Sequence, residues 1–190
     1  MRPKKAVIVL GSPRKNGNSA SLARETAEGI MTSGSECESF FLHKMDIKPC
    51  DACDLCRKNI EDPCIIDDDM QIIYPKLRQA DVLVIAGPVY FATVSAQTKL
   101  FMDRCYALSG PVDSALKGKR IGTILTYEDP DPFVSGAVNA LRTFQDVYNY
   151  VGATIIGNVY GSALEPGEIK KNRDVMNRAF ELGKKLVDFE

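Results

Sequence analysis

The sequence lacks several of the residues and patterns that mark common classes of protein. It has no tryptophan and one histidine, His43, among its 190 residues. Zinc enzymes commonly bind their metal through two or three histidines, so mononuclear sites of that kind are excluded. Lysine and arginine are dispersed along the chain and the formal net charge is -1. The sequence therefore does not predict a nucleic-acid partner.

Long apolar runs are missing as well. No stretch is apolar over the roughly 20 residues that a membrane-spanning helix needs. The basic start of the chain leads into a short apolar run, 6–10, and then into a glycine loop instead of a signal-peptide cleavage site. We therefore expect a soluble, cytoplasmic protein with no membrane partner. Its length and 45% hydrophobic content suit a single domain over residues 1–190.

The chain opens with a predicted strand, a polar loop and the start of a helix. Residues 6–10 are apolar throughout, as in a buried parallel strand, and helical spacing begins at residue 19. Glycines at 11 and 17 allow a close backbone approach. Ser12, Asn18 and Ser19 offer hydroxyl and amide donors, and Arg14 offers the N–H groups of its guanidinium. Together with the helix N-terminus they predict a site for one phosphate, and the alternative is an ordinary capping turn.

Strand-like and helix-like segments then alternate along the chain. Further strands are predicted at 36–42, 82–86, 120–127 and 153–160, and helices at 19–31, 70–77, 95–105, 136–150 and from 166 onward. This alternation predicts a five-stranded parallel α/β sheet, doubly wound in the flavodoxin-like order 2-1-3-4-5. Ligands of such sheets bind beyond the carboxyl ends of the first and third strands. An aromatic turn follows the third strand, so the predicted layout suits the phosphate and ring of FMN.

A window rich in cysteine, 48–66, follows the second strand. It contains Cys50, Cys53, Cys56 and Cys64. The first three, spaced C-x2-C-x2-C, cannot all share one face of a helix or strand, so we expect them to bind a common ligand. This spacing is typical of iron–sulfur ligation, whereas zinc more often takes well-separated C-x2-C pairs. Zinc and redox-active or bare thiols remain the alternatives.

Other polar residues have simpler interpretations. Cys37 and Cys105 fall inside predicted elements and are interpreted as small hydrophobic residues. The acidic run 67–69 precedes a helix and is interpreted as a cap that complements the helix dipole. Ser95 is predicted to cap the next helix. His43 is expected to be exposed or locally hydrogen-bonded.

Taken together, the motifs resemble the NADPH-dependent FMN reductase family of flavodoxin-like proteins. Gly11-Ser12-Pro13-Arg14 with Asn18-Ser19 is similar to the family's phosphate loop. Pro88-Val89-Tyr90-Phe91, with Ser95-Ala96-Gln97 and Phe101-x-Asp103-Arg104, matches its second signature. Within the family, the cysteine window resembles that of the iron–sulfur flavoproteins, which carry FMN and a four-iron four-sulfur cluster. The loop 126–132 departs from the glycine-rich loop that is often found there.

The resemblance implies roles for particular residues. The FMN phosphate would be bound by Ser12, Arg14, Asn18 and Ser19, the flavin by Pro88, Val89, Tyr90, Phe91 and Tyr127, and the cluster by Cys50, Cys53, Cys56 and Cys64. No catalytic acid or base is implied, because the flavin carries the chemistry. Flavin and cluster together would convert two-electron into one-electron transfer.

The resemblance also implies partners and leaves alternatives open. The electron donor would be ferredoxin or NAD(P)H, and the chain would form a homodimer or homotetramer in which a neighbouring subunit supplies the closer cluster. One alternative is an NAD(P)H-dependent FMN or quinone reductase without a cluster, and another is an electron carrier without turnover of its own. A third, of a different class, is a zinc-stabilised flavodoxin-like binding module without flavin.

Overall fold

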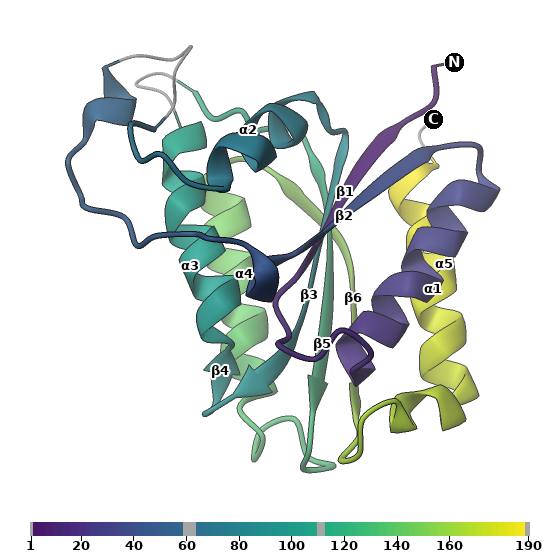
Figure 1. The fold of residues 1–190 in the computed structure, drawn as a ribbon. Coiled ribbons are helices and arrows are strands. Elements are labelled where there is room, and N and C mark those ends of the chain that lie inside the picture. Colours follow the sequence, from purple (N-terminus) through teal and green to yellow (C-terminus); the bar gives the residue numbers. More distant parts are fainter. Residues whose placement is uncertain (1, 59–63, 110–112, 189–190) are drawn as a thin grey trace.

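The structure is a computed structural model that describes residues 2–58, 64–109 and 113–188. Its centre is a parallel sheet in the order β2-β1-β3-β5-β6 (Figure 1). The strands are β1 (Lys5–Leu10), β2 (Glu36–Phe41), β3 (Val82–Tyr90), β5 (Arg120–Tyr127) and β6 (Thr154–Ser162). The predicted flavodoxin-like α/β fold is therefore confirmed in its sheet direction and in the order of its parallel strands.

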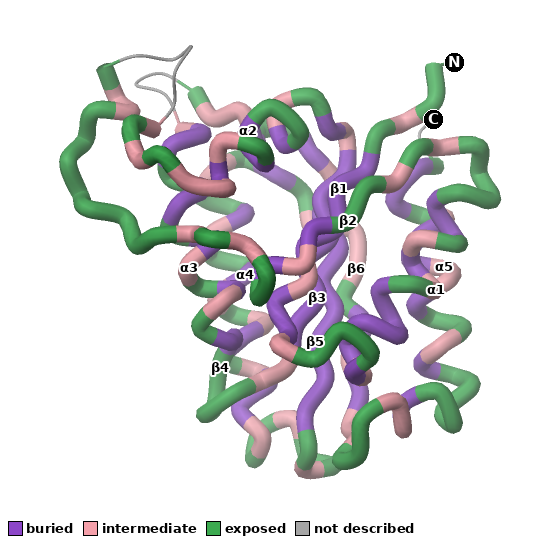
Figure 2. Tube along the Cα trace, in the orientation of Figure 1, coloured by how far each residue is buried: buried purple, intermediate pink, exposed green. Residues whose placement is uncertain are grey.

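Helices cover both faces of this sheet (Figure 1). The helices on one face are α1 (Asn18–Thr32) and α5 (Arg173–Val187), and those on the other are α2 (Met70–Gln79), α3 (Ala96–Arg104) and α4 (Ala137–Tyr150). Two layers of core result, and the buried segments in Figure 2 follow the strands. Alternate residues of β1 serve opposite layers, since Val7 packs in one and Ile8 in the other. This is why β1 reads as one continuous apolar run.

The helices α1 and α5 approach each other at two glycines. A Cβ added at Gly29 would lie 2.1 Å from the Phe180 carbonyl oxygen, and one at Gly183 would lie 2.1 Å from the Thr26 carbonyl oxygen. The Thr26 hydroxyl also donates across the interface to the Ala179 carbonyl oxygen at 2.9 Å. Backbone against backbone leaves no room for a side chain, so both glycines are required by the packing.

The structure corrects the predicted fold in two places. The third strand does not end at residue 86 but runs to Tyr90, and a short sixth strand, β4 (Thr93–Val94), pairs antiparallel with it. The chain reverses at Phe91 and Ala92, which have positive φ values of 48° and 71°. The closing helix begins at Arg173, because a short 3-10 turn, Glu168–Lys171, occupies the segment after residue 166. Among the described helices, none combines the length and apolar character that crossing a bilayer demands.

Candidate functional site

A pocket of about 240 Å³ opens at the carboxyl edge of the sheet, where the loops after β1, β3, β5 and β6 meet. It is lined by Ser12, Arg14, Gly17, Asn18, Ser19, Pro88, Val89, Tyr90, Thr126, Tyr127, Glu128, Ala163 and Leu164. The structure thus brings together eight of the nine residues predicted to contact FMN: the four in the opening loop, the last three of β3, and Tyr127. The ninth, Phe91, does not line the pocket, and its side chain is fully exposed at the tip of the β3–β4 turn.

The loop after β1 presents polar groups to this pocket. Ser12 and Ser19 are buried, and the Ser12 Oγ accepts a hydrogen bond from the Arg14 backbone N–H at 3.1 Å. Helix α1 begins directly after Gly17, and no side chain caps its first turn. The first N–H groups of a helix have no partner within the helix, so these donors are available to an anion. Arg14 lies exposed at the rim and adds a positive charge.

Asn18 lines the same pocket, but its side chain is already engaged. Its Nδ2 donates to the carbonyl oxygens of Ala163 at 3.3 Å and Glu165 at 3.0 Å, and its Oδ1 accepts from the Ile169 N–H at 3.2 Å. These bonds fasten the start of α1 to the segment that follows β6. The Asn18 side chain therefore shapes the pocket wall, and its backbone N–H is the group left to contact an anion.

The buried Ser95 hydroxyl group fastens the loop after β1 to the start of α3. The Ser95 Oγ donates to the Gly11 carbonyl oxygen at 2.7 Å and lies 3.0 Å from the Thr98 Oγ1. The Gly11 N–H donates to the Ala86 carbonyl oxygen at 2.8 Å. The predicted cap is confirmed, since Ser95 also accepts from the Thr98 N–H at 3.3 Å. Sequence reasoning missed its second role, because the partner lies 84 residues away.

Apolar and aromatic side chains form the other wall of the pocket. Pro88 and Val89 are half-buried, and Tyr90 is partly exposed. Tyr127 is buried at the end of β5, with its ring 6.4 Å from that of Tyr160 between centroids. Burial raises the pKa of Tyr127 above its ordinary value, so its hydroxyl keeps its proton at neutral pH and can donate a hydrogen bond.

The cysteine window forms a second, smaller hollow. Cys50, Cys53, Cys56 and Cys64 all line it, together with Arg104. Burial raises the pKa of Cys56, and so does the charge of the other three thiols, which lie close enough to act on it. Ala52 and Asp54 have positive φ values of 51° and 55°; such turns direct backbone N–H groups into a common concavity that suits anions, including iron–sulfur centres.

The thiols converge without forming a finished metal site. The hollow measures about 20 Å³, which is room for about one water molecule. Within the described ranges, no three cysteine, histidine or acidic side chains are arranged as metal ligands. The remaining cysteines agree with the prediction that they are core residues: Cys105 is buried, and burial raises the pKa of the half-buried Cys37 to about 11.

The two hollows lie at opposite ends of α3. Ser95 caps the end of this helix next to the pocket, and Arg104, its last residue, lines the cysteine hollow. The helix has nine residues, which corresponds to about 14 Å. The chain leaves β2 at the pocket edge and then runs back beside α3, so the cysteine window lies at the other end of the sheet (Figure 1). Loop direction follows from where its side chains dock, which no local pattern encodes.

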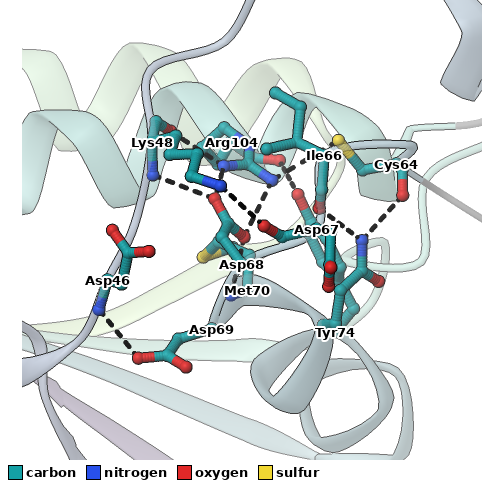
Figure 3. Close-up of polar contacts among 11 residues, drawn as sticks. Asp46, Lys48, Cys64, Ile66, Asp67, Asp68, Asp69, Met70, Tyr74 and Arg104 are labelled. Atoms are coloured by element: carbon teal, nitrogen blue, oxygen red, sulfur yellow. Dashed lines mark hydrogen bonds and ion pairs between the residues drawn. The ribbon is translucent and has the colours of Figure 1, made fainter.

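The acidic run 67–69 is more than an exposed cap. The Asp68 carboxylate is buried and pairs with the buried guanidinium of Arg104 (Figure 3). It also accepts hydrogen bonds from the backbone N–H groups of Lys48 at 2.9 Å and Met70 at 3.0 Å. Burial alone raises the pKa of Asp68, but the hydrogen bonds from Arg104 and from these two N–H groups outweigh it, so the pKa lies below its ordinary value.

Comparisons with known proteins agree with this geometry. The profile of the NADPH-dependent FMN reductase family matches residues 4–165. An iron-sulfur flavoprotein of Methanosarcina thermophila is 32% identical over 186 residues, covering 95% of this chain and 92% of that protein. An iron-sulfur flavoprotein of Methanocaldococcus jannaschii is 29% identical over 195 residues, covering 97% of this chain and 96% of that one.

Solved structures share the fold. The NAD(P)H:quinone oxidoreductase from Methanothermobacter marburgensis superposes with a TM-score of 0.78 at 16% identity, covering 100% of this chain and 98% of that chain. The matched family profile spans β1 through β6 and therefore all four loops of the pocket. The chain belongs to the NADPH-dependent FMN reductase family and is a flavin-dependent oxidoreductase.

Proposed function

We propose that the chain, acting as one FMN-binding unit over residues 1–190, passes electrons between a reduced carrier, FMN in the edge pocket and a four-iron four-sulfur cluster bound by the cysteine window. NAD(P)H is the donor that the family favours, and ferredoxin is the alternative. The observation that carries the proposal is the meeting, in one pocket, of a helix N-terminus, buried serines and an aromatic wall. Such a pocket fits a molecule with a phosphate at one end and a flat ring at the other.

The residues divide between the two ends of the ligand. Ser12, Arg14, Ser19 and the first N–H groups of α1 would bind the phosphate, and Pro88, Val89, Tyr90 and Tyr127 would flank the flavin. The bound flavin supplies the electron and hydride chemistry. The chain's residues orient it and restrict water; the one carboxylate in the lining, Glu128, is exposed. We therefore assign no catalytic acid or base.

The side chains of the cysteine window are of the kind that binds an iron–sulfur cluster. Four thiols, a turn with two residues of positive φ and a buried guanidinium meet at one hollow, and the relatives compared above are named iron-sulfur flavoproteins. Opening of the hollow on binding is required, because about 20 Å³ is too small for a cluster. We place the protein in the cytoplasm, where cysteines stay reduced.

The position of the hollow favours an oligomer. The length of α3, about 14 Å, separates it from the pocket within one chain. We propose a homodimer or homotetramer in which the cluster of one subunit comes nearer to the flavin of another. Analytical ultracentrifugation tests this, and a monomer under turnover conditions contradicts it.

The FMN site is tested with two ligands. Arg14→Ala removes a charge-assisted contact to phosphate, typically worth about 1.5–3 kcal/mol, so FMN affinity falls by roughly ten- to a hundredfold. Riboflavin, which has no phosphate, binds with unchanged affinity. Lys15→Ala removes a neighbouring exposed charge that does not line the pocket and is the matched control. Equal losses for both ligands in Arg14→Ala contradict the phosphate assignment.

The metal site is tested by composition. Anaerobically prepared protein should contain iron and acid-labile sulfide, and serine at any of the four window cysteines should remove them while FMN stays bound. Serine at Cys37 or Cys105 is the control and leaves the iron content unchanged. A protein with flavin but no metal supports the second candidate, a cluster-free FMN or quinone reductase, which the absence of a preformed ligand arrangement in the described ranges favours. Stoichiometric zinc without sulfide contradicts the cluster.

A further inference from the structure

Arg104 connects the cysteine hollow to a buried ion pair. Its side chain is the largest fully buried one among the described residues, with 1% of its surface exposed, and it lies at the end of α3. Its guanidinium pairs with Asp68, whose side chain has no exposed surface, and its Nη1 also donates to the Lys48 carbonyl oxygen at 2.8 Å. The two partners precede and follow the four window cysteines in sequence, Lys48 before Cys50 and Asp68 after Cys64 (Figure 3). The guanidinium is thus held in one orientation by groups on both sides of the four cysteines.

The same guanidinium reaches a sulfur atom. Its Nη2 lies 3.4 Å from the Cys64 Sγ and 3.2 Å from the Asp68 Oδ1. Its Nε is buried and has no hydrogen-bond partner within the described part of the chain. Buried N–H donors are nearly always paired, because an unpaired one loses its hydration without compensation. Arg104 therefore brings to the hollow one N–H donor bound to a cysteine and another that lacks an acceptor.

We propose that Arg104 is a positioning residue of the metal centre: it donates a charged hydrogen bond to the Cys64 thiolate, offers its Nε–H to a second sulfur, and so raises the reduction potential of the cluster. The inference rests on the proposed cluster. Reduction adds negative charge, and hydrogen bonds to the sulfurs, together with nearby charge, set the potential of such centres. A buried cation beside the sulfurs stabilises the reduced state more than the oxidised state. Asp68 does not line the hollow, so its charge acts from behind the guanidinium.

The experiment compares two arginines near the window. Arg57 carries the same charge, but its Nη1 donates to the Ser109 carbonyl oxygen at 2.8 Å and its guanidinium stacks over Tyr106, without a described sulfur contact. Wild type, Arg104→Gln and Arg57→Gln are reconstituted anaerobically with iron and sulfide, and midpoint potentials are measured by dithionite titration followed by electron paramagnetic resonance. We expect Arg104→Gln to shift the oxidised-to-reduced equilibrium at least tenfold toward oxidised, about 59 mV for one electron. Arg57→Gln should shift it several-fold less.

A second variant guards against a folding failure. Arg104→Gln leaves the Asp68 carboxylate buried without its cation, which is strongly destabilising. The double variant Asp68→Asn with Arg104→Gln removes both charges and keeps neutral hydrogen-bonding groups. It should still bind FMN, and its cluster potential should also lie below that of wild type, because the charged donor at the sulfur is gone.

The outcomes separate this inference from the proposed function. If wild type takes up no iron and acid-labile sulfide, the proposed cluster is wrong and the inference falls with it. If wild type carries the cluster but the Arg104→Gln and double variants keep its potential, only the inference is overturned. Equal shifts in Arg104→Gln and Arg57→Gln also overturn it, because they reveal a general effect of charge instead of a contact with sulfur. A lower midpoint potential in the two Arg104 variants, with little change in Arg57→Gln, supports the inference.

Discussion

Gly11 offers the sharpest test of how the pocket is built, because it touches the buried hydroxyl groups at the start of α3. A Cβ added at Gly11 would lie 1.9 Å from the Thr98 Oγ1 and 3.2 Å from the Ser95 Oγ. Gly11 is not among the residues with positive φ, so alanine meets no backbone strain there. Any effect of Gly11→Ala therefore comes from the missing space.

The expected size follows from these contacts. Forcing one methyl group into a filled site costs about 1–3 kcal/mol. Displacing the loop also weakens the Ser95 hydrogen bond to the Gly11 carbonyl, worth about 1 kcal/mol. We expect Gly11→Ala to lower the free energy of unfolding by about 2–4 kcal/mol. FMN affinity should fall as well, because the loop that carries Ser12 and Arg14 moves with Gly11.

A double-mutant cycle isolates the cause. Thr98→Ala removes the hydroxyl that the new methyl group would strike and alone costs about 0.5–1.5 kcal/mol for a lost hydrogen bond. After that change the nearest remaining Thr98 atom is the Cβ, at 3.2 Å, so Gly11→Ala should be tolerated better. Urea unfolding should show the double variant more stable than the sum of the single losses by at least about 1 kcal/mol. Strictly additive losses would refute the steric argument, and unchanged FMN affinity in Gly11→Ala would refute the link to the pocket.

Three further predictions concern other parts of the chain. Gly183→Ala should lower the free energy of unfolding by about 1–3 kcal/mol, because its Cβ would lie 2.1 Å from the Thr26 carbonyl oxygen; unchanged thermal unfolding contradicts this. Cys37, with its pKa raised by burial to about 11, is about one-thousandth thiolate at pH 8, so iodoacetamide should label it over a hundredfold more slowly than an unstructured cysteine. Asp68→Asn should destabilise the protein by about 3–5 kcal/mol at pH 7. Because folding lowers the pKa of Asp68, the carboxylate stabilises the protein fully above its unfolded pKa, near 4. This stabilisation is lost as the pH falls through the folded pKa. Urea unfolding from pH 7 to 3 should therefore show the difference in unfolding free energy between wild type and Asp68→Asn becoming smaller.

Much of the fold follows from local pattern. The apolar runs of β1 and β3 and the helical spacing between the strands predict a parallel sheet, and the order 2-1-3-4-5 is chosen from the two common orders of doubly wound sheets. The pocket residues follow from the same order, since it places the loops after β1 and β3 side by side. The sequence predicts a turn over 87–91, after a strand that ends at residue 86. The strand β3 instead continues through Gly87 and Pro88, because pairing with β5 and β4 outweighs the local turn signal.

Long-range partners are what the sequence does not show. The acidic neighbours of Asp68 predict that it is part of an exposed helix cap. In the structure it is buried and pairs with Arg104, which lies 36 residues further along the chain. The partners of the Asn18 side chain are also distant in sequence, so the loop alone does not show that this side chain bonds to the chain itself. The direction of the cysteine loop likewise depends on distant contacts. A polar side chain in a loop signals that a hydrogen bond is made, and the docked partner decides whether that bond goes to a ligand or to the chain itself.

The hydrogen bonds of Asn18 have a consequence for synthesis on the ribosome. Their partners lie 145 to 151 residues further along the chain, so the start of α1 leaves the exit tunnel long before the segment that braces it. Closing so large a loop is entropically unfavourable until β6 has joined the sheet. We therefore expect a nascent chain stalled before β6 to have the phosphate loop in its sequence but no braced pocket, and to bind flavin only after β6 has been made and paired.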